Sequence, residues 1–247
     1  MSPGSAPAVL VGGGKGGVGK SSASAGIARG LREAGLGVGL LDADLSGPSQ
    51  NLLLRCSQMR GADGKIVPAR SSEGIDVVST GLIARADSAL VWSGLTATAA
   101  IESFASPAVW SGVDVVIVDL PPGHAEIAMK VATSFPQASA VLVTTGSVLA
   151  VDECRRAANF MQRMEIPVLG LVDNMALTYC GTCERYSEVF PGGLVEALAG
   201  EVGVPVLARV IFGADPASGT AMAPVVSAIV PALGLAAGIA GTDEVEE

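Results

Sequence analysis

Residues 14–21 read GKGGVGKS, a run in which two lysines are set among four glycines. Glycines let the backbone curl so that successive N–H groups point at one anion, and the positive end of a following helix adds to that attraction. The pattern matches a phosphate-binding P-loop, and it predicts that Lys20 contacts the β- and γ-phosphates of ATP while the Ser21 hydroxyl ligates Mg²⁺. The predicted nucleotide-binding residues of this loop are Gly14, Lys15, Gly16, Gly17, Val18, Gly19, Lys20, Ser21 and Ser22.

Three acids follow apolar runs that are expected to be strands. Asp42 and Asp44 end the run 38–44, and Asp119 ends the run 113–120. Ligands of open parallel sheets bind at the carboxyl ends of the strands, so these acids are expected beside the P-loop. Mg²⁺ keeps several waters and usually takes one or two carboxylates, so Asp119 is predicted to hold it directly or through water, without all three acids touching the ion. Gly123, after two prolines, is predicted to bring an N–H close to the γ-phosphate.

Cys180 and Cys183 form the one cysteine pair with metal-like spacing, CGTC. Structural zinc and most iron–sulfur clusters take four protein ligands, and this pair supplies two. A redox pair and a zinc site are the alternatives, whereas two subunits related by a twofold axis would bring four thiolates together. Cys56 and Cys154 stand alone and are expected to be small buried residues.

Short apolar runs alternate with segments of helical spacing along the chain, which predicts an α/β fold with a doubly wound, mainly parallel sheet in one domain over residues 1–247. The stretch 50–73 is polar and broken by glycines, and is expected to be a surface excursion. The expected helices include 21–35 and 152–164. The expected strands are 8–11, 38–44, 75–80, 113–120, 139–145, 167–174 and 204–210.

Composition narrows the possible partners. The net charge of -9 argues against a nucleic-acid surface and against docking on anionic lipid.

Residues 216–242 carry no charge and are long enough to cross a bilayer, but their Ala, Gly and Pro content favours a buried terminal helix before an acidic tail. The start of the chain has no signal-peptide pattern, and four cysteines in a chain of this length favour a reduced, cytoplasmic setting.

The loop with two lysines resembles the deviant Walker A signature of one P-loop branch. That branch includes the Mrp/ApbC iron–sulfur carriers, the MinD and ParA positioning ATPases, the arsenite-pump ATPase and the nitrogenase iron protein. The resemblance implies that Lys15 reaches the nucleotide across a dimer interface and, with Lys20, stabilises the charge that grows during hydrolysis. It also implies that Asp44 lies near the γ-phosphate and the attacking water.

Further blocks resemble the Mrp/ApbC family and its eukaryotic cytosolic relatives from about Val9 to Ile211: DLSGPS, VWSGL, WSGVDVVIVDLPPG, TTGSVLAVDECRR, LVDNM and the CxxC followed by VFPGG. This resemblance implies an ATPase that assembles or transfers a [4Fe–4S] cluster to apoproteins. The cluster would bridge two subunits through the segment 175–195, in a homodimer or in a heterodimer with a related ATPase. Asn174 would read the adenine edge, because an amide both donates and accepts hydrogen bonds.

One departure concerns the segment PPGHAE, where the family usually has PPGTGD or PPGTSD. It places His124, the one histidine, in the expected switch loop, and it puts the rate of hydrolysis in doubt more than nucleotide binding. Two other functions remain open, and His124 bears on the second of them. One is a MinD/ParA-like positioning ATPase, which would have no use for the CxxC. The other is a nucleotide-switched scaffold with negligible turnover.

Overall fold

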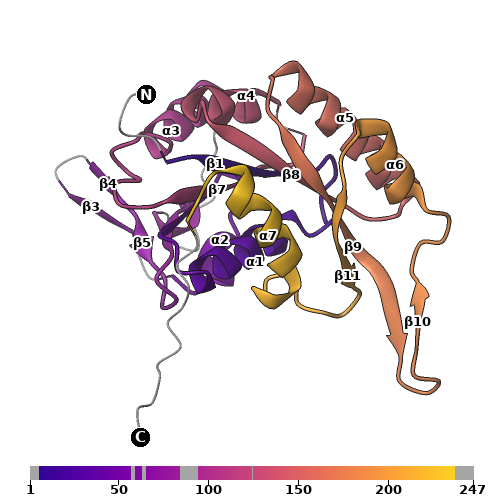
Figure 1. The fold of residues 1–247 in the computed structure, drawn as a ribbon. Helices are drawn as coiled ribbons and strands as arrows, with labels where there is room; N and C mark the ends of the chain where they lie inside the picture. The colour runs from indigo at the N-terminus through magenta and orange to yellow at the C-terminus, as the bar shows by residue number, and fades with distance from the viewer. Residues whose placement is uncertain (1–5, 57–58, 63–64, 84–93, 124, 237–247) are drawn as a thin grey trace, which may run out of the picture.

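The computed structural model describes residues 6–56, 59–62, 65–83, 94–123 and 125–236, and Figure 1 shows a twisted central sheet with helices on both faces. The sheet has nine strands in the order β10-β9-β8-β1-β7-β2-β6-β5, and β11 pairs with β9. All pairs are parallel except β10 with β9 and β5 with β6. The strands are β1 (Ala8–Gly12), β2 (Val38–Asp42), β5 (Ala69–Arg70), β6 (Asp76–Val78), β7 (Val115–Asp119), β8 (Ala138–Thr144), β9 (Val168–Cys180), β10 (Arg185–Glu188) and β11 (Val206–Ile211). The predicted α/β fold with a mainly parallel sheet is confirmed.

The helices form two layers, one on each face of the sheet (Figure 1). Along β1, Val9 and Val11 join the core under one layer, and Ala8 and Leu10 join the core under the other, because successive side chains of a strand point to opposite faces. A continuously apolar strand is therefore buried on both sides, as the sequence indicated. One layer contains α1 (Lys20–Glu33), α2 (Gln50–Leu53), the 3₁₀ turn η2 (Thr220–Met222) and α7 (Ala223–Ala232); the other contains α3 (Gly94–Phe104), α4 (Ala125–Ser134), α5 (Val148–Arg163) and α6 (Leu194–Val202).

The segment 50–73 differs from its prediction at both ends. Gln50 and Leu54 are fully buried, and β5 adds an antiparallel strand to the sheet edge. The prediction of a surface excursion is wrong there because polarity is a poor guide to burial when a polar side chain is hydrogen-bonded inside. Between these ends, β3 (Arg60–Ala62) and β4 (Lys65–Val67) pair with each other in a separate two-stranded sheet, and the 3₁₀ turn η1 (Thr80–Leu82) follows β6.

The uncharged stretch 216–242 contributes α7, whose Val225, Val226 and Ile229 are buried. Within the described ranges, none of the helices combines the length and the apolar character that crossing a membrane requires. The acidic tail lies outside the described residues.

Two glycines of α1 allow the chain after β11 to pack closely against this helix. A Cβ on Gly26 would overlap the carbonyl oxygen of Pro216, and a Cβ on Gly30 would lie 2.7 Å from Cγ2 of Val226. Small residues at these two positions, one helical turn apart, thus set the distance between α1 and the η2–α7 segment.

We predict that Gly26→Ala lowers the free energy of unfolding by about 1–3 kcal/mol, because the added methyl meets a backbone oxygen that is unable to turn away. Gly200 is the matched control, since it lies inside α6 with open space around its missing side chain. Gly200→Ala should stabilise by about 0.5–1 kcal/mol, which is the difference in helix propensity. Urea unfolding measures the change in the free energy of unfolding for each variant. The same change in Gly26→Ala and Gly200→Ala would contradict the close packing proposed at Gly26.

Candidate functional site

The loop 13–19 joins β1 to α1 at the carboxyl edge of the sheet. Gly17 and Gly19 have φ of 83° and 94°, in the left-handed region that favours glycine. A Cβ on Gly13 would overlap the Val143 carbonyl oxygen, and one on Gly14 would overlap Glu153 of α5. Two glycines therefore serve the turn and two serve close packing, while Gly16 has open space beside it.

Lys20 begins α1 and is buried, whereas Lys15 is exposed. The Lys20 ammonium donates a hydrogen bond to the Lys15 carbonyl oxygen at 2.8 Å, so it lies over the loop. Burial lowers the pKa of Lys20, and the charges of Asp119 and Asp44 oppose that shift. The loop thus has one cation held inside it and a second that extends into solvent.

Asp42 and Asp119 end two neighbouring strands in matched register and are both buried. Oδ2 of Asp42 accepts from the backbone N–H groups of Ser49 and Gln50, at 3.0 and 3.1 Å, and from the Ser79 hydroxyl at 3.0 Å. Burial, and then the neighbouring charge of Asp119, raise the pKa of Asp42 to about 7. The structure therefore brings the two predicted acids together. The three hydrogen bonds to Asp42 offset part of the free energy that its burial costs.

Both carboxylate oxygens of Asp119 are hydrogen-bonded. Oδ1 accepts from the Ser24 hydroxyl at 3.1 Å, and Oδ2 accepts from Gln50 Nε2 at 2.8 Å. Burial raises the pKa of Asp119, and the hydrogen bonds from Gln50, Ser21 and Ser24 oppose that shift. Sequence reasoning missed Ser24 and Gln50. The helical period could have found Ser24, since it lies one turn after Lys20, but no local signal identifies Gln50.

The other predicted residues of this edge lie close by. Asp44 is half-buried, and its Oδ1 accepts from the Gly47 N–H at 2.9 Å. Ser21 and Ser22 are half-buried in the first turn of α1. Gly123 is exposed with φ of 72°, a conformation that suits glycine, and His124 lies outside the described residues.

Asn174 is buried behind the P-loop. Its Nδ2 donates to the Val18 carbonyl oxygen at 2.9 Å, and a Cβ on Gly19 would overlap its amide. The structure thus places this amide against the P-loop, and the contact of Asn174 with adenine stays a prediction.

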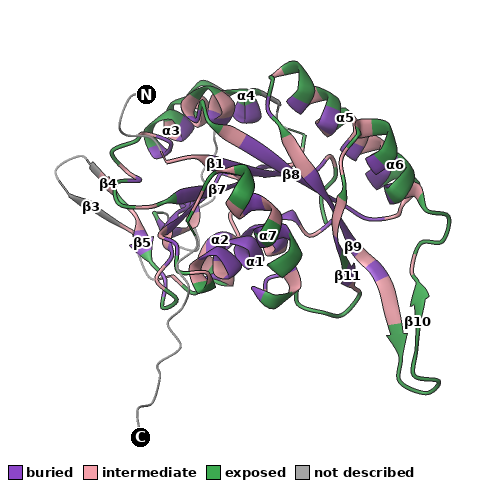
Figure 2. Cartoon of the chain, in the orientation of Figure 1, coloured by how far each residue is buried: buried purple, intermediate pink, exposed green. Residues whose placement is uncertain are grey.

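Cys180 and Cys183 lie at the end of a hairpin that projects from the body of the molecule (Figures 1 and 2). Strand β9 extends six residues beyond its predicted end at Asn174. Residues 177–180 pair with β10, and Leu177 also pairs with Ile211 of β11. The prediction ended too early because the end of β9 and all of β10 are exposed and lack the hydrophobic signal of a buried strand. Both thiols are exposed, and backbone N–H groups of Cys183 and Thr182 lower the pKa of the Cys180 thiol. A lowered pKa favours the thiolate, which is the form that binds metal.

The other two cysteines have a different environment. Cys154 is fully buried and Cys56 partly buried, and burial raises the pKa of their thiols to about 12 and about 11. Across the described residues, no group of three or more histidines, cysteines or acids is arranged to hold a metal ion. A metal centre held by the hairpin pair would therefore need further ligands from elsewhere.

An arginine joins the base of the hairpin to the sheet. The Arg209 guanidinium on β11 lies 3.1 Å from Glu188 of β10, 3.5 Å from Asp173 of β9 and 3.6 Å from Glu196 of α6. Asp173 is buried, and its Oδ1 lacks a hydrogen-bond partner among the residues described. Burial raises the pKa of Asp173 to about 6 although Arg209 opposes the shift.

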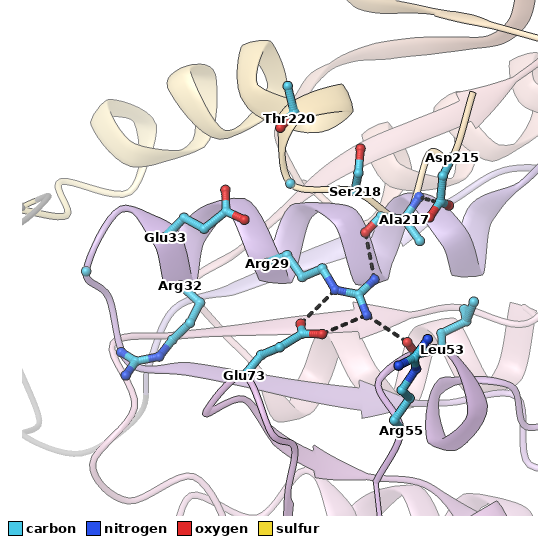
Figure 3. A pocket seen from close by; sticks show the side chains of 12 residues that line it. Arg29, Arg32, Glu33, Leu53, Arg55, Glu73, Asp215, Ala217, Ser218 and Thr220 are labelled. Carbon is cyan, nitrogen blue, oxygen red and sulfur yellow. Dashed lines mark hydrogen bonds and ion pairs between the residues drawn. The ribbon is translucent and has the colours of Figure 1, made fainter.

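A cleft of about 890 Å³ lies beside the second half of α1, away from the P-loop (Figure 3). The Arg29 guanidinium crosses it, donating to Glu73 at 2.7 and 3.0 Å and to the carbonyl oxygens of Leu53 and Ala217 at 2.7 Å. Arg29 thereby ties together α1, α2 and the segment before α7, so its charge is already satisfied within the fold.

Comparison with known proteins identifies the family to which this chain is similar. Residues 6–227 match the model of ParA-type NUBPL iron-transfer P-loop NTPases. The chain is 39% identical over 210 residues to the cytosolic Fe-S cluster assembly factor NUBP2 of Bos taurus, covering 82% of this chain and 78% of that protein. It is 34% identical over 203 residues to the iron-sulfur cluster carrier protein of Haemophilus influenzae, covering 81% of this chain and 55% of the relative, and so spans about half the length of that protein.

Solved structures give a consistent result. A nucleotide-binding protein of Archaeoglobus fulgidus in complex with ADP superimposes with a TM-score of 0.70 at 26% identity, over 88% of this chain and 87% of that one. The septum site-determining protein MinD of Pyrococcus horikoshii superimposes with a TM-score of 0.63 at 18% identity, over 91% and 96% of the two chains, which shows a shared fold.

We predict that Asp173→Asn flattens the pH dependence of stability between about pH 4 and 6. The pKa of Asp173 is higher in the folded than in the unfolded chain, so the folded state loses stability as the acid ionises with rising pH. The free energy of unfolding of Asp173→Asn, relative to wild type, should therefore rise by roughly 1–3 kcal/mol from pH 4 to pH 7.

Urea unfolding at several pH values measures this difference. Arg209→Gln is the second variant. It should lose more stability than wild type as the pH rises, because Arg209 lowers the pKa of Asp173 and its removal raises that pKa further. Parallel pH profiles for wild type and Asp173→Asn would contradict the assignment.

Proposed function

Because the chain belongs to the NUBPL iron-transfer P-loop NTPase family, we propose that it binds ATP and carries a [4Fe–4S] cluster to apo iron–sulfur proteins. The observation that carries this proposal is the exposed pair of Cys180 and Cys183, which ends a strand that touches the P-loop at Asn174. The names of the relatives support the same function. The cytosolic relative and the free cysteines support action in a reducing, cytoplasmic compartment.

ATP would bind over the loop, with Lys20 on its phosphates and Ser21 as a ligand of Mg²⁺. The edge of the sheet suits Mg²⁺ because it offers hard oxygen donors, and the buried Gln50 Oε1 is an acceptor without a donor among the described residues. Bound there, Mg²⁺ would neutralise the phosphate charge. Asp119 and Asp42 would attract the ion, and Asn174 would contact the adenine.

Hydrolysis of ATP would use groups that touch the γ-phosphate. The exposed Lys15 can extend to the nucleotide of a second subunit, where its charge would stabilise the transition state. Asp44, near enough to Lys20 to influence its pKa, would orient the attacking water. Gly123 would bring its N–H to the γ-phosphate. The buried Lys20 would act on every nucleotide state, and Lys15 mainly on the transition state.

The cluster is the cargo in this scheme. Two subunits, identical or related, would each contribute Cys180 and Cys183, which completes four thiolates. Their position at the end of an exposed hairpin leaves the cluster accessible to an acceptor protein. Iron and acid-labile sulfide after anaerobic reconstitution test the proposal, with about four iron atoms expected per two chains. Tight zinc without iron would move the function away from cluster transfer.

We predict that Lys20→Ala and Lys15→Ala separate binding from turnover. Lys20→Ala should lower ATP affinity by roughly 10- to 100-fold, because the phosphates lose a buried charged donor. Lys15→Ala should keep an affinity close to that of wild type and lower kcat by roughly 10³-fold, as expected for a cation that acts on the transition state. Calorimetry and phosphate release measure the two effects.

An equal loss of affinity in both variants would contradict the cross-subunit action of Lys15. A wild type that binds ATP but shows no turnover above background, with or without cluster, would make the protein a nucleotide-switched scaffold.

We predict that Cys180→Ser or Cys183→Ser abolishes the iron–sulfur absorption and weakens the dimer, because each removes one thiolate per subunit. Both variants should retain ATP binding. The matched controls are Cys56→Ser and Cys154→Ala, whose thiols stay protonated in the fold and should change neither property. Visible absorption and sedimentation velocity give the readouts, and a cluster that persists in a monomer would refute the bridging arrangement.

A further inference from the structure

Gln50 connects the acid at the end of β7 to the helix that follows the P-loop. It is the first residue of α2, and its side chain is fully buried. Its Nε2 donates to the Ser21 carbonyl oxygen at 2.9 Å and to Asp119 Oδ2 at 2.8 Å. Both hydrogens of the amide nitrogen are therefore used, one on each partner.

The oxygen of the same amide is in a different position. Oε1 of Gln50 is buried without a donor among the described residues. A buried acceptor left unpaired typically costs about 1–3 kcal/mol. This cost points to a hydrogen-bond donor that is present only when a ligand is bound. The amide is unable to turn toward another donor, because its nitrogen is already hydrogen-bonded to Ser21 and Asp119.

We propose that Gln50 is a positioning residue for the magnesium site, in which Nε2 orients Asp119 and Oε1 accepts a hydrogen bond from the water shell of the ion. Mg²⁺ keeps several of its waters in protein sites, and each of those waters is a donor. The Ser24 hydroxyl holds the second oxygen of Asp119, so the carboxylate is fixed from two sides. This inference rests on the proposed binding of ATP with Mg²⁺ and adds a residue to that site.

The short helix that carries Gln50 is anchored at both of its ends. At its start, Asp42 accepts from the backbone N–H groups of Ser49 and Gln50. At its end, Arg29 donates to the Leu53 carbonyl oxygen while paired with Glu73 (Figure 3). The amide is thus held in place by the fold before any ligand binds, which lowers the entropy lost when the site is filled.

The test measures how nucleotide affinity depends on Mg²⁺, using ADP and isothermal titration calorimetry with magnesium at several concentrations and with EDTA. Gln50→Leu should need about 10-fold more Mg²⁺ to reach half of the magnesium-dependent gain in affinity, as found when outer-shell partners of a metal are removed. Its affinity for ADP in EDTA should equal that of wild type. Gln50→Met, which preserves the length of the side chain, is the second variant if Gln50→Leu folds poorly.

Asn51→Leu is the matched control, because Asn51 is the next residue of α2 and its amide lies against Gly81 instead of Asp119. It should leave the magnesium dependence unchanged. An equal loss of ADP affinity with magnesium and with EDTA in Gln50→Leu would overturn the proposal in favour of a purely structural amide. An unchanged magnesium dependence would overturn it as well. Failure of the wild type to bind nucleotide at all would instead count against the proposed function.

Discussion

Two carboxylates buried side by side, Asp42 and Asp119, are the constraint on which the rest of this site depends. Their strands are in matched register, so each acid is buried beside a group of the same charge. Burying an ionised group is costly unless donors or opposite charges surround it. The pKa of Asp42, raised to about 7, shows that the donors offset this cost only in part. A divalent cation at the same edge would favour the ionised form of both acids, because it replaces their mutual repulsion by attraction.

The donors that satisfy these acids come from segments that the fold must hold in place. Ser24 belongs to α1, Gln50 to α2, and Ser79 to the end of β6. Arg29 then links α1 and α2 to the chain before α7 (Figure 3), and Gly26 lets that chain approach α1 closely. The geometry around Asp42 and Asp119 therefore depends on helix packing within about two turns of Ser24 and Gln50. A change in that packing would alter hydrogen bonds to Asp119 without touching the P-loop.

Much of this arrangement could be predicted from the sequence, because the relevant signals are local. The P-loop pattern 14–21 has few alternative structures, and buried parallel strands read as continuous apolar runs. The approach of Asp42 to Asp119 followed from the rule that carboxyl ends of parallel strands meet at one edge. Gln50 could not be predicted, because its contacts join it to residues 29 and 69 positions away in the chain. The hairpin after Asn174 was missed because the end of β9 and all of β10 are exposed and carry no hydrophobic period.

Strand β9 connects the P-loop directly to the exposed cysteine pair. Asn174 binds the Val18 carbonyl of the P-loop, and Cys180 lies six residues further along the same strand, which is roughly 20 Å of chain at the rise of a β-strand. Met175 between them has a left-handed φ of 56°, and the pairing of β9 with β11 shifts register before Leu177, so the strand is bent where it leaves the core. Arg209 holds that bend through Asp173 and Glu188. Any movement of the loop that displaces Val18 must therefore break the hydrogen bond to Asn174 or move the strand that carries the cysteines.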